Sequence, residues 1–203
     1  MAWTSSSGLV LASASEARAR LLAAAGLDFR VEPSQIDEVA IKRVFRADGR
    51  SAGDCALALA DAKARSVARR DPEALVIGAD QILVCDREWF DKPADLSAAR
   101  TQLAALRGRT HVLATAVCAV RAGEPGWRHL SAPQLTMRRF SDSFLDDYFA
   151  AEAAAVLGSV GSYRLEARGV QLFERIEGDH FSILGLPLIE LLAFLRGLGV
   201  VAT

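Results

Sequence analysis

Lysine is unusually scarce in this 203-residue chain. Only Lys42, Lys63 and Lys92 occur among its 24 basic residues, so arginine supplies almost all of the positive charge. Against that background a lysine is a candidate for a specific task, because its ammonium is a compact, strongly hydrated point charge that suits a phosphate oxygen. A plain surface position is the alternative for Lys42.

The chain also has only three cysteines and a net charge close to zero. Cys55, Cys85 and Cys118 are odd in number, widely spaced and free of any C-x-x-C pair. This pattern argues against a disulfide framework or a zinc cluster and predicts reduced, buried thiols. A net charge of −1 and a pI near 6.3 give no bulk attraction to nucleic acid or anionic lipid. We therefore expect neither as a partner, and any anion site must be local.

Several familiar motifs are missing. The sequence has no G-x-x-x-x-G-K-[ST] phosphate loop, and the absence of G-x-G-x-x-G disfavours a generic Rossmann-like dinucleotide binder. The first residues lack a basic segment, and the apolar run after them is too short for a signal peptide or membrane span, which predicts a cytoplasmic location. With 51% hydrophobic and 24% charged residues, we expect one globular domain over 1–203.

Helical and strand patterns interleave along the chain. Strands are expected at 9–13, 29–32, 74–79, 81–85, 111–121 and 162–166, with a loosely alternating antiparallel partner at 128–140. Helices are expected at 15–25, 51–70, 96–107, 141–151 and 186–198, and a polar loop around 35–38. This alternation predicts an α/β fold with a mixed sheet.

The run from Ala74 to Gln81 (A-L-V-I-G-A-D-Q) is the most informative segment. It predicts a buried strand that leads into the carboxylate of Asp80, with Gly78 giving the backbone room at the carboxyl end of the strand. Strand ends are where α/β proteins place their chemistry. Lys92 follows after a short hairpin, and an acid and a cation so placed indicate a phosphate-and-metal site. The alternative is that Asp80 caps a turn and Lys92 is solvated.

A second candidate lies where the first strand meets the first helix. Ser13, Ser15 and Arg18 place donors at a helix N-terminus, which carries unpaired N–H groups and partial positive charge and so suits a phosphate. The alternative is simple capping by Ser15 with Arg18 in solvent.

Carboxylates at Asp37, Glu38 and Asp80 offer the hard oxygen ligands that magnesium or manganese prefers. A bound dication would acidify an attacking water, and a carboxylate could orient or deprotonate it. By themselves, Asp37 and Glu38 are also compatible with a solvated loop.

Taken in order, several segments resemble the Maf family of nucleoside triphosphate pyrophosphatases, from about Leu9 to Leu198. The segments are L-A-S-x-S-x-x-R at Leu11 to Arg18, Asp37-Glu38, Ala62 to Ala64, Gly78 to Gln81, Lys92-Pro93, Gly108 to His111, Gly161 to Tyr163 with Glu166, and Gly185 to Leu188. The resemblance implies a mixed, twisted central sheet flanked by helices, with two lobes around a deep cleft, similar to inosine triphosphate pyrophosphatases. It also implies a homodimer.

The resemblance further implies cleavage of a nucleotide between its α and β phosphates, giving a nucleoside monophosphate and pyrophosphate with the help of magnesium or manganese. Asp80 would then accept the proton, and Glu38 would hold metal or water. The resemblance also implies that both carboxylates are metal ligands. The implied triphosphate ligands are Ser13, Ser15, Arg18, Lys63 and Lys92. Such chemistry mostly needs positioning and charge neutralisation.

Base preference rests on fewer residues. Gln81 and Glu166 resemble the branch that takes 7-methyl-GTP, whereas the dTTP/UTP branch usually has Thr and Gln there. Glu16 and Ala17 depart from the family pattern, which usually has proline and a basic or aromatic residue, so Ala17 also bears on selectivity. Glu166 could instead pair with Arg164 or Arg168.

Two other functions stay open at this point. One is a pyrophosphatase that prefers dTTP, UTP or CTP. The other is a nucleotide-sensing regulator of cell division and septum formation, in which the same residues bind without turnover.

Overall fold

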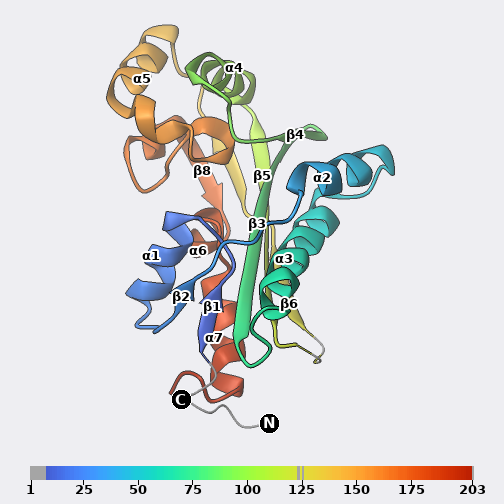
Figure 1. The fold of residues 1–203 in the computed structure, drawn as a ribbon. Coiled ribbons are helices and arrows are strands. Elements are labelled where there is room, and N and C mark those ends of the chain that lie inside the picture. Colours follow the sequence, from blue (N-terminus) through green and yellow to red (C-terminus); the bar gives the residue numbers. More distant parts are fainter. Residues whose placement is uncertain (1–7, 123, 125, 203) are drawn as a thin grey trace. The chain divides into compact units, whose positions relative to one another are not determined.

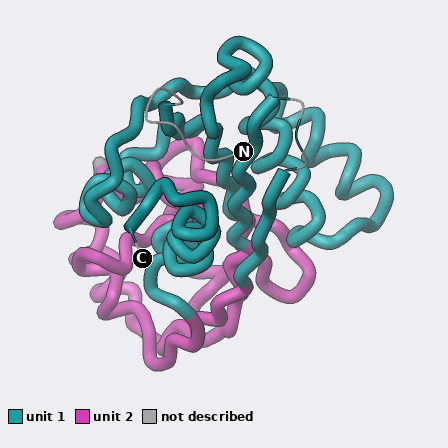
Figure 2. The backbone as a smooth tube through the Cα atoms, turned by 90° about the horizontal axis from the view of Figure 1, so that it is seen from below, with its two compact units in different colours: residues 1–81, 115–131, 179–203 teal, residues 82–114, 132–178 magenta. Residues whose placement is uncertain are grey.

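The structure is a computed structural model that describes residues 8–122, 124 and 126–202. Its backbone forms two compact units, one of residues 1–81, 115–131 and 179–203 and the other of residues 82–114 and 132–178 (Figure 2). We call them unit 1 and unit 2. The chain passes from one unit to the other inside two long strands, β3 (Leu75–Cys85) and β5 (Thr110–Val120).

Strands and helices alternate along the chain, so the predicted α/β class is confirmed (Figure 1). The other strands are β1 (Leu9–Leu11), β2 (Arg30–Val31), β4 (Glu88–Phe90), β6 (Trp127–Ser131), β7 (Gln134–Met137) and β8 (Phe173–Glu177). The helices are α1 (Glu16–Ala24), α2 (Glu38–Ala47), α3 (Ala52–Ala68), α4 (Leu96–Leu106), α5 (Asp142–Val156), α6 (His180–Ile183) and α7 (Leu188–Gly197). The strands hydrogen-bond in the order β2-β1-β3-β5-β7-β8, with β4 on β3 and β6 on β5.

The sheet is mixed, as predicted. β1 pairs in parallel with both β2 and β3, and Leu11 lies opposite Ile77 at the end of the β1–β3 ladder. β5 pairs antiparallel with β6 in unit 1 and with β7 in unit 2, and β7 continues to β8. The loosely alternating stretch predicted at 128–140 is therefore two short strands that pair with different halves of β5.

Alternate residues of β1 and β3 point to opposite faces of the sheet. Leu11, Ile77 and Ala79 pack in one buried cluster with side chains from α1 and α7. Val10 and Val76 belong to a second cluster with side chains of α3. Both faces of these strands are therefore covered, which explains why their sequences are almost continuously apolar.

Gly78 has a different role from the one that the sequence predicts. It lies in the middle of β3, which is one continuous strand where the sequence predicts two, at 74–79 and 81–85. A Cβ at this position would lie 2.1 Å from the backbone oxygen of Ala60 in α3. The glycine therefore lets the helix backbone rest directly on the strand. Asp80 is accordingly an interior strand residue, not the end of a strand.

The predicted loop at 35–38 is partly wrong, because Glu38 begins α2. Asp37 is the N-cap of that helix, and its carboxylate accepts a hydrogen bond from Ala40 N–H at 2.9 Å. The signal is present in the sequence, since Asp37 precedes apolar Ile41 and Phe45 at helical spacing. The neighbouring charges conceal it.

The strand predicted at 162–166 is also wrong. A short 3₁₀ turn covers Val160–Ser162, where Gly161 has φ of 77° and Ser162 has φ of 61°, so the backbone is not extended. The strand of this region is β8, which the sequence pattern did not predict because Phe173–Glu177 (F-E-R-I-E) is short and mostly charged.

The remaining expected elements are confirmed to within a few residues, including Ser15 and Ser141 as helix caps. α5 runs further than expected, to Val156, and the last helix begins at Leu188. The three cysteines are free and buried, as predicted. Among the described residues, no helix is both long and apolar enough to cross a membrane.

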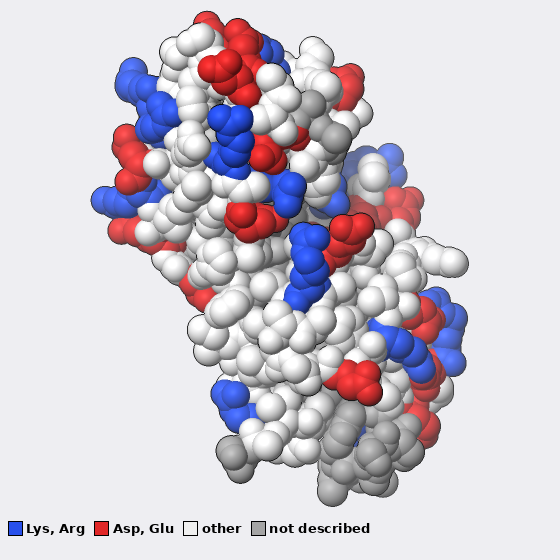
Figure 3. Space-filling view, turned by 90° about the vertical axis from the view of Figure 1, so that its left-hand side faces the viewer, with Lys and Arg blue, Asp and Glu red and all other residues white. Residues whose placement is uncertain are grey.

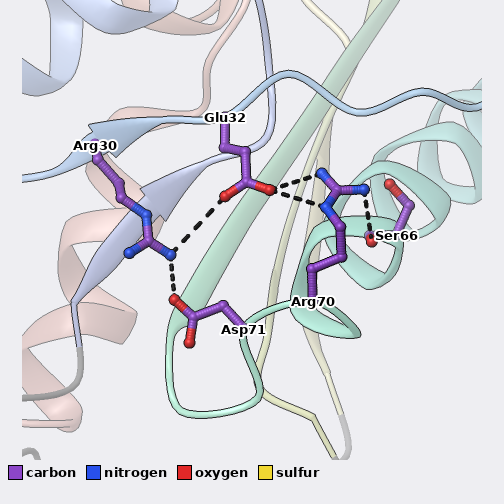
Figure 4. A network of polar contacts seen from close by, with 5 residues as sticks. All are labelled: Arg30, Glu32, Ser66, Arg70 and Asp71. Atoms are coloured by element: carbon purple, nitrogen blue, oxygen red, sulfur yellow. Dashed lines mark hydrogen bonds and ion pairs between the residues drawn. The ribbon is translucent and has the colours of Figure 1, made fainter.

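A polar network ties the edge strand β2 to the segment after α3 (Figure 4). Glu32 accepts two hydrogen bonds from the guanidinium of Arg70, at 2.7 and 3.0 Å, and Arg30 pairs with Asp71. Arg70 also donates to the carbonyl of Ser66. Exposed pairs contribute little singly, but together these contacts hold Arg30 and Glu32 against the segment after α3.

Elsewhere on the surface the two signs of charge are interspersed. On the face drawn in Figure 3, basic and acidic side chains lie among uncharged ones without a continuous field of either sign over the described residues. This distribution accords with the near-zero net charge of the sequence.

A buried histidine lies in unit 2. His111 Nε2 lies 2.8 Å from the hydroxyl of Tyr163, and its ring packs against those of Tyr163 and Phe173. Burial lowers the pKa of His111 from 6.5 to about 4. The imidazole is therefore neutral in the folded protein at neutral pH.

This pKa makes stability depend on pH. Because the unfolded chain binds a proton near pH 6.5 and the folded chain only near pH 4, the contribution of neutral His111 is complete above pH 6.5 and is lost as the pH falls toward 4. The full difference corresponds to about 3 kcal/mol. In His111→Gln the free energy of unfolding should fall less between pH 7 and pH 4 than in the wild type, as measured by urea denaturation. Parallel curves for the two proteins would contradict this assignment.

Candidate active site

Unit 1 contains a buried cluster of one lysine and two carboxylates. The ammonium of Lys63 lies 2.6 Å from Asp80 Oδ1 and 2.9 Å from Glu38 Oε1. Lys63 and Asp80 are both buried, whereas the side chain of Glu38 is 42% exposed. The cluster therefore has a closed end at Asp80 and an open end at Glu38.

Three elements supply these side chains. Asp80 projects from β3 on the same face as Val76 and Gly78, which is the face covered by α3. Lys63 lies on α3 between Ala60 and Ala64, whose backbone atoms would meet a Cβ on Gly78. The close approach allowed by Gly78 therefore brings Lys63 within reach of Asp80.

The second oxygen of Asp80 is an unusual feature. Asp80 Oδ2 is buried and accepts no hydrogen bond from the described part of the chain. A buried carboxylate oxygen without a donor is costly, so its presence indicates a bound water or ligand as partner. The formal charge of Lys63, Asp80 and Glu38 together is −1, which favours a cation.

The oxygen atoms of these residues suit a divalent metal ion. Asp80 Oδ2 and Glu38 offer hard oxygen atoms, and magnesium is commonly held by one or two carboxylates together with substrate phosphates and water. No group of three or more metal-binding side chains occurs among the described residues. The donor set therefore fits a cation that arrives with a phosphate substrate.

The predicted phosphate-binding residues at the start of α1 lie together. Ser15 caps the helix and accepts from Arg18 N–H at 3.4 Å, while Ser13 Oγ accepts from Ser15 N–H at 3.3 Å. Ala17 lies in the first turn of the same helix and is half-buried. The structure thus brings Ser13, Ser15, Ala17 and Arg18 to one helix N-terminus.

Arg18 is half-buried, and hydrogen bonds hold its guanidinium in place. Its Nη1 donates to Ser13 Oγ at 3.0 Å and to the carbonyl of Ala79 at 2.9 Å, and its Nε donates to the carbonyl of Gly185 at 2.8 Å. Burial lowers the pKa of Arg18, and the charges of Asp80 and Glu38 oppose that shift. Nη2 donates to no described residue, so its two N–H groups are the part of Arg18 that can meet a phosphate.

Gln81 is also held by the protein. Its Nε2 donates to Thr115 Oγ1 at 2.8 Å and to the carbonyls of Ser182 and Ile183 at 3.0 and 3.1 Å. Because Gln81 follows Asp80 in a strand, its side chain points to the opposite face of the sheet. Only its amide oxygen is left to contact a ligand.

Two predicted site residues, Lys92 and Glu166, belong to unit 2. Lys92 is exposed just beyond β4, which pairs with β3 in the predicted hairpin. Glu166 lies 3.4 Å from Arg164 Nε, so the alternative of an ion pair with Arg164 is observed. That these two residues contact a nucleotide stays a prediction.

Some residues near the cluster were not predicted from the sequence as site residues. Thr115 and Ser182 contact Gln81, but an isolated threonine in an apolar strand and a serine in a short helix carry no recognisable motif. Cys55 is close enough for Asp80 to act on it, yet burial, with a smaller contribution from Asp80, raises the pKa of its thiol to about 11. Cys55 is therefore not an activated nucleophile.

Comparison with known families gives a match over nearly the whole chain. The model of the Maf family, described as Maf-like protein, matches residues 8–198. The chain belongs to the Maf family. The matched residues include every member of the Lys63 cluster and of the α1 N-terminus.

Curated relatives agree with the Maf assignment. A protein from Granulibacter bethesdensis named nucleoside triphosphate pyrophosphatase is 53% identical over 93% of this chain and 95% of its own length. A protein of the same name from Paramagnetospirillum magneticum is 54% identical over 92% of this chain and 96% of its own. A 7-methyl-GTP pyrophosphatase from Rhizobium meliloti is 48% identical over 95% and 97% of the two chains.

Among solved structures, a dITP/XTP pyrophosphatase from Mycobacterium abscessus is 17% identical. The alignment covers 66% of this Maf protein and 75% of that chain, with a TM-score of only 0.42.

The buried ion pair predicts a large effect of replacing its lysine. In Lys63→Met the carboxylate of Asp80 stays buried without its partner, so the free energy of unfolding should fall by about 3–5 kcal/mol. Arg65→Met is the matched control, because Arg65 is two residues away on α3 and pairs with Asp61 at an exposed site. That control should cost less than about 1 kcal/mol. Guanidinium denaturation at pH 7 measures both, and equal losses would contradict the role given to Lys63.

Proposed function

We propose that this protein is a nucleoside triphosphate pyrophosphatase that hydrolyses the bond between the α and β phosphates. The observation that carries the proposal is the buried carboxylate of Asp80, with Lys63 on one oxygen and no donor among the described residues on the other. The names of its Maf relatives support the same reaction class.

Asp80 is the proton acceptor in this scheme. Lys63 holds Oδ1 at 2.6 Å and so fixes the plane of the carboxylate, which leaves Oδ2 to take a proton from water. The water oxygen forms a bond to the α phosphorus as the bond to the α–β bridging oxygen breaks. Pyrophosphate leaves with that oxygen, and the nucleoside monophosphate keeps the oxygen from water.

Ser13, Ser15 and Arg18 bind the phosphates in the same scheme. The N-terminus of α1 provides main-chain N–H groups and partial positive charge, and Arg18 adds the two N–H groups of Nη2. The contacts of Arg18 with Ala79 and Gly185 hold its guanidinium in place before substrate binds, which reduces the ordering cost of binding. Lys92 adds a further positive charge in the proposal.

Asp80 and Glu38 would hold magnesium or manganese together with substrate phosphates. When bound, the metal neutralises phosphate charge and lowers the pKa of a coordinated water. Glu38 is suited to this role because its side chain is partly exposed while Lys63 holds its inner oxygen.

The proposed substrate class is a purine nucleotide of the 7-methyl-GTP type. Two Maf relatives at 47% and 48% identity are named 7-methyl-GTP pyrophosphatase. The free groups of Gln81 and Glu166 are hydrogen-bond acceptors, which suit the N–H edge of guanine, and the carboxylate also suits a positively charged methylated ring. We further propose that the enzyme is a cytoplasmic homodimer in which residues 1–203 act as one domain.

Replacing the proposed base tests the reaction. Asp80→Asn should lower metal-dependent pyrophosphate release by at least about 100-fold, because an amide cannot accept the proton from water. Asp61→Asn is the control, since Asp61 is a carboxylate on α3 that pairs with Arg65 instead of Lys63. Conversion of nucleoside triphosphate to monophosphate is measured by chromatography with magnesium or manganese and again with excess EDTA, which should abolish it.

Circular dichroism and the melting temperature must also show that the Asp80→Asn protein is folded. Near-normal turnover in a folded Asp80→Asn protein would rule out the proposed base. Release that stops after one equivalent per wild-type protein would favour the nucleotide-sensing alternative over an enzyme.

A substrate panel tests the proposed base preference. Turnover of 7-methyl-GTP should exceed that of GTP, dTTP, UTP and CTP at equal concentration, by about 10-fold or more if the acceptors of Gln81 and Glu166 read the purine edge. Measuring kcat/KM for each nucleotide gives the ranking. A clear preference for pyrimidine nucleotides would contradict the assignment while leaving the reaction class intact.

A further inference from the structure

The backbone on both sides of Asp80 is tied to the same turn. On one side, Arg18 joins the carbonyl of Ala79 to that of Gly185. On the other, Gln81 reaches the carbonyls of Ser182 and Ile183. The turn Ser182–Gly185 therefore contacts both chain neighbours of the proposed base through side chains, a feature that substrate binding alone does not require.

The hydrogen bond from Arg18 to the Ala79 carbonyl takes the place of one that a neighbouring strand would otherwise donate. The parallel ladder of β1 and β3 ends at Leu11 and Ile77, and Ala12 N–H donates to the Ile77 carbonyl at 2.7 Å. The next β3 carbonyl on that edge is that of Ala79. It accepts a hydrogen bond from Arg18 Nη1 where a paired strand would supply an N–H. Arg18 thereby completes the backbone hydrogen bonding of β3 directly before Asp80.

The amide of Gln81 can have only one orientation. Two of its neighbours are carbonyl oxygens, which only accept, so the group that faces them must be the NH₂. The third neighbour is Thr115 Oγ1, whose proton is used in a hydrogen bond to the Ser182 carbonyl at 3.0 Å, so it accepts from Gln81. Thr115 thus fixes which end of the amide faces the turn.

Thr115 itself is fully buried on β5 and takes no part in the proposed chemistry. Its hydroxyl links Gln81 to the carbonyl of Ser182, so the strand pair β3 and β5 and the turn share one hydrogen-bonded set. The set lies on the sheet face opposite Lys63, because Gln81 and Asp80 are consecutive strand residues.

We propose that Thr115, Gln81 and Arg18 are positioning residues that anchor the main chain around Asp80 to the Ser182–Gly185 turn and so hold its carboxylate against Lys63. The inference rests on the proposed function in one respect, that Asp80 acts as the base. It adds Thr115 as a determinant of turnover and gives Arg18 and Gln81 a task besides any contact with nucleotide.

The test is the isosteric change Thr115→Val, which removes the hydroxyl and keeps the shape. A base held less firmly lowers the rate of the chemical step, so kcat should fall about 10-fold while KM stays within about twofold. Thr115→Ser restores the hydroxyl and should recover most of the loss. Thr110→Val is the matched control on the same strand, because the Thr110 hydroxyl contacts that of Thr136 at an exposed site, and it should keep wild-type kcat and KM.

A second measurement does not depend on activity. The amides of Leu184, Gly185 and Leu186 donate to carbonyls within the turn and α6, so hydrogen exchange of a peptide over 180–186 reports on the anchor. Exchange there should become at least about fivefold faster in Thr115→Val and stay unchanged in Thr110→Val. If Thr115→Val fails to fold, Gln81→Met at its half-buried position replaces it, with kcat taken at saturating substrate.

The outcomes separate the two proposals. Faster exchange together with a lower kcat supports the anchor. Unchanged exchange, or a wild-type kcat in folded Thr115→Val, overturns it, as does a rise in KM alone. Faster exchange in a protein whose wild type releases no pyrophosphate supports the anchor and overturns only the proposed function.

Discussion

The contact between the Lys63 ammonium and Asp80 is the interaction on which the rest of the site depends. Two opposite charges are taken out of water between β3 and α3, where separation of the pair would leave a charge uncompensated. Burial of such a pair adds little net stability, so its value lies in fixing where one carboxylate oxygen points. Glu38 then contacts a lysine whose position is already set by Asp80.

The two faces of β3 divide the work. On one face, Asp80 meets Lys63 and offers its second oxygen. On the other, Arg18 and Gln81 bind the turn at Ser182–Gly185. Consecutive residues of a strand therefore separate the proposed reactive and supporting roles without any loop between them, and Asp80 lies inside a long strand.

Much of the fold follows from the sequence, and the failures have physical causes. Long amphipathic or apolar segments such as Ala52–Ala68 and Thr110–Val120 are predicted because their pattern repeats over many residues. α2 and β8 are missed because charged residues obscure a short pattern, and 162–166 is misread because positive φ at Gly161 and Ser162 leaves no trace in hydropathy. Residue chemistry indicated Asp80 and made Glu38 and Lys63 candidates, whereas their separate roles came from the family resemblance. The hydrogen bond between Gln81 and Thr115 could not be predicted, because it joins two strands that are far apart in the sequence.

The missing side chain at Gly78 has a consequence for how this protein can evolve. Because α3 lies against the bare backbone there, the gap between helix and strand is set by the thickness of the main chain. Any larger residue would act as a wedge and lift the lysine away from its carboxylate, even in a variant that still folds. If Asp80 is the base as proposed, drift at this one position is constrained by the reaction as well as by packing, and thermal stability is then a poor guide to which substitutions it tolerates.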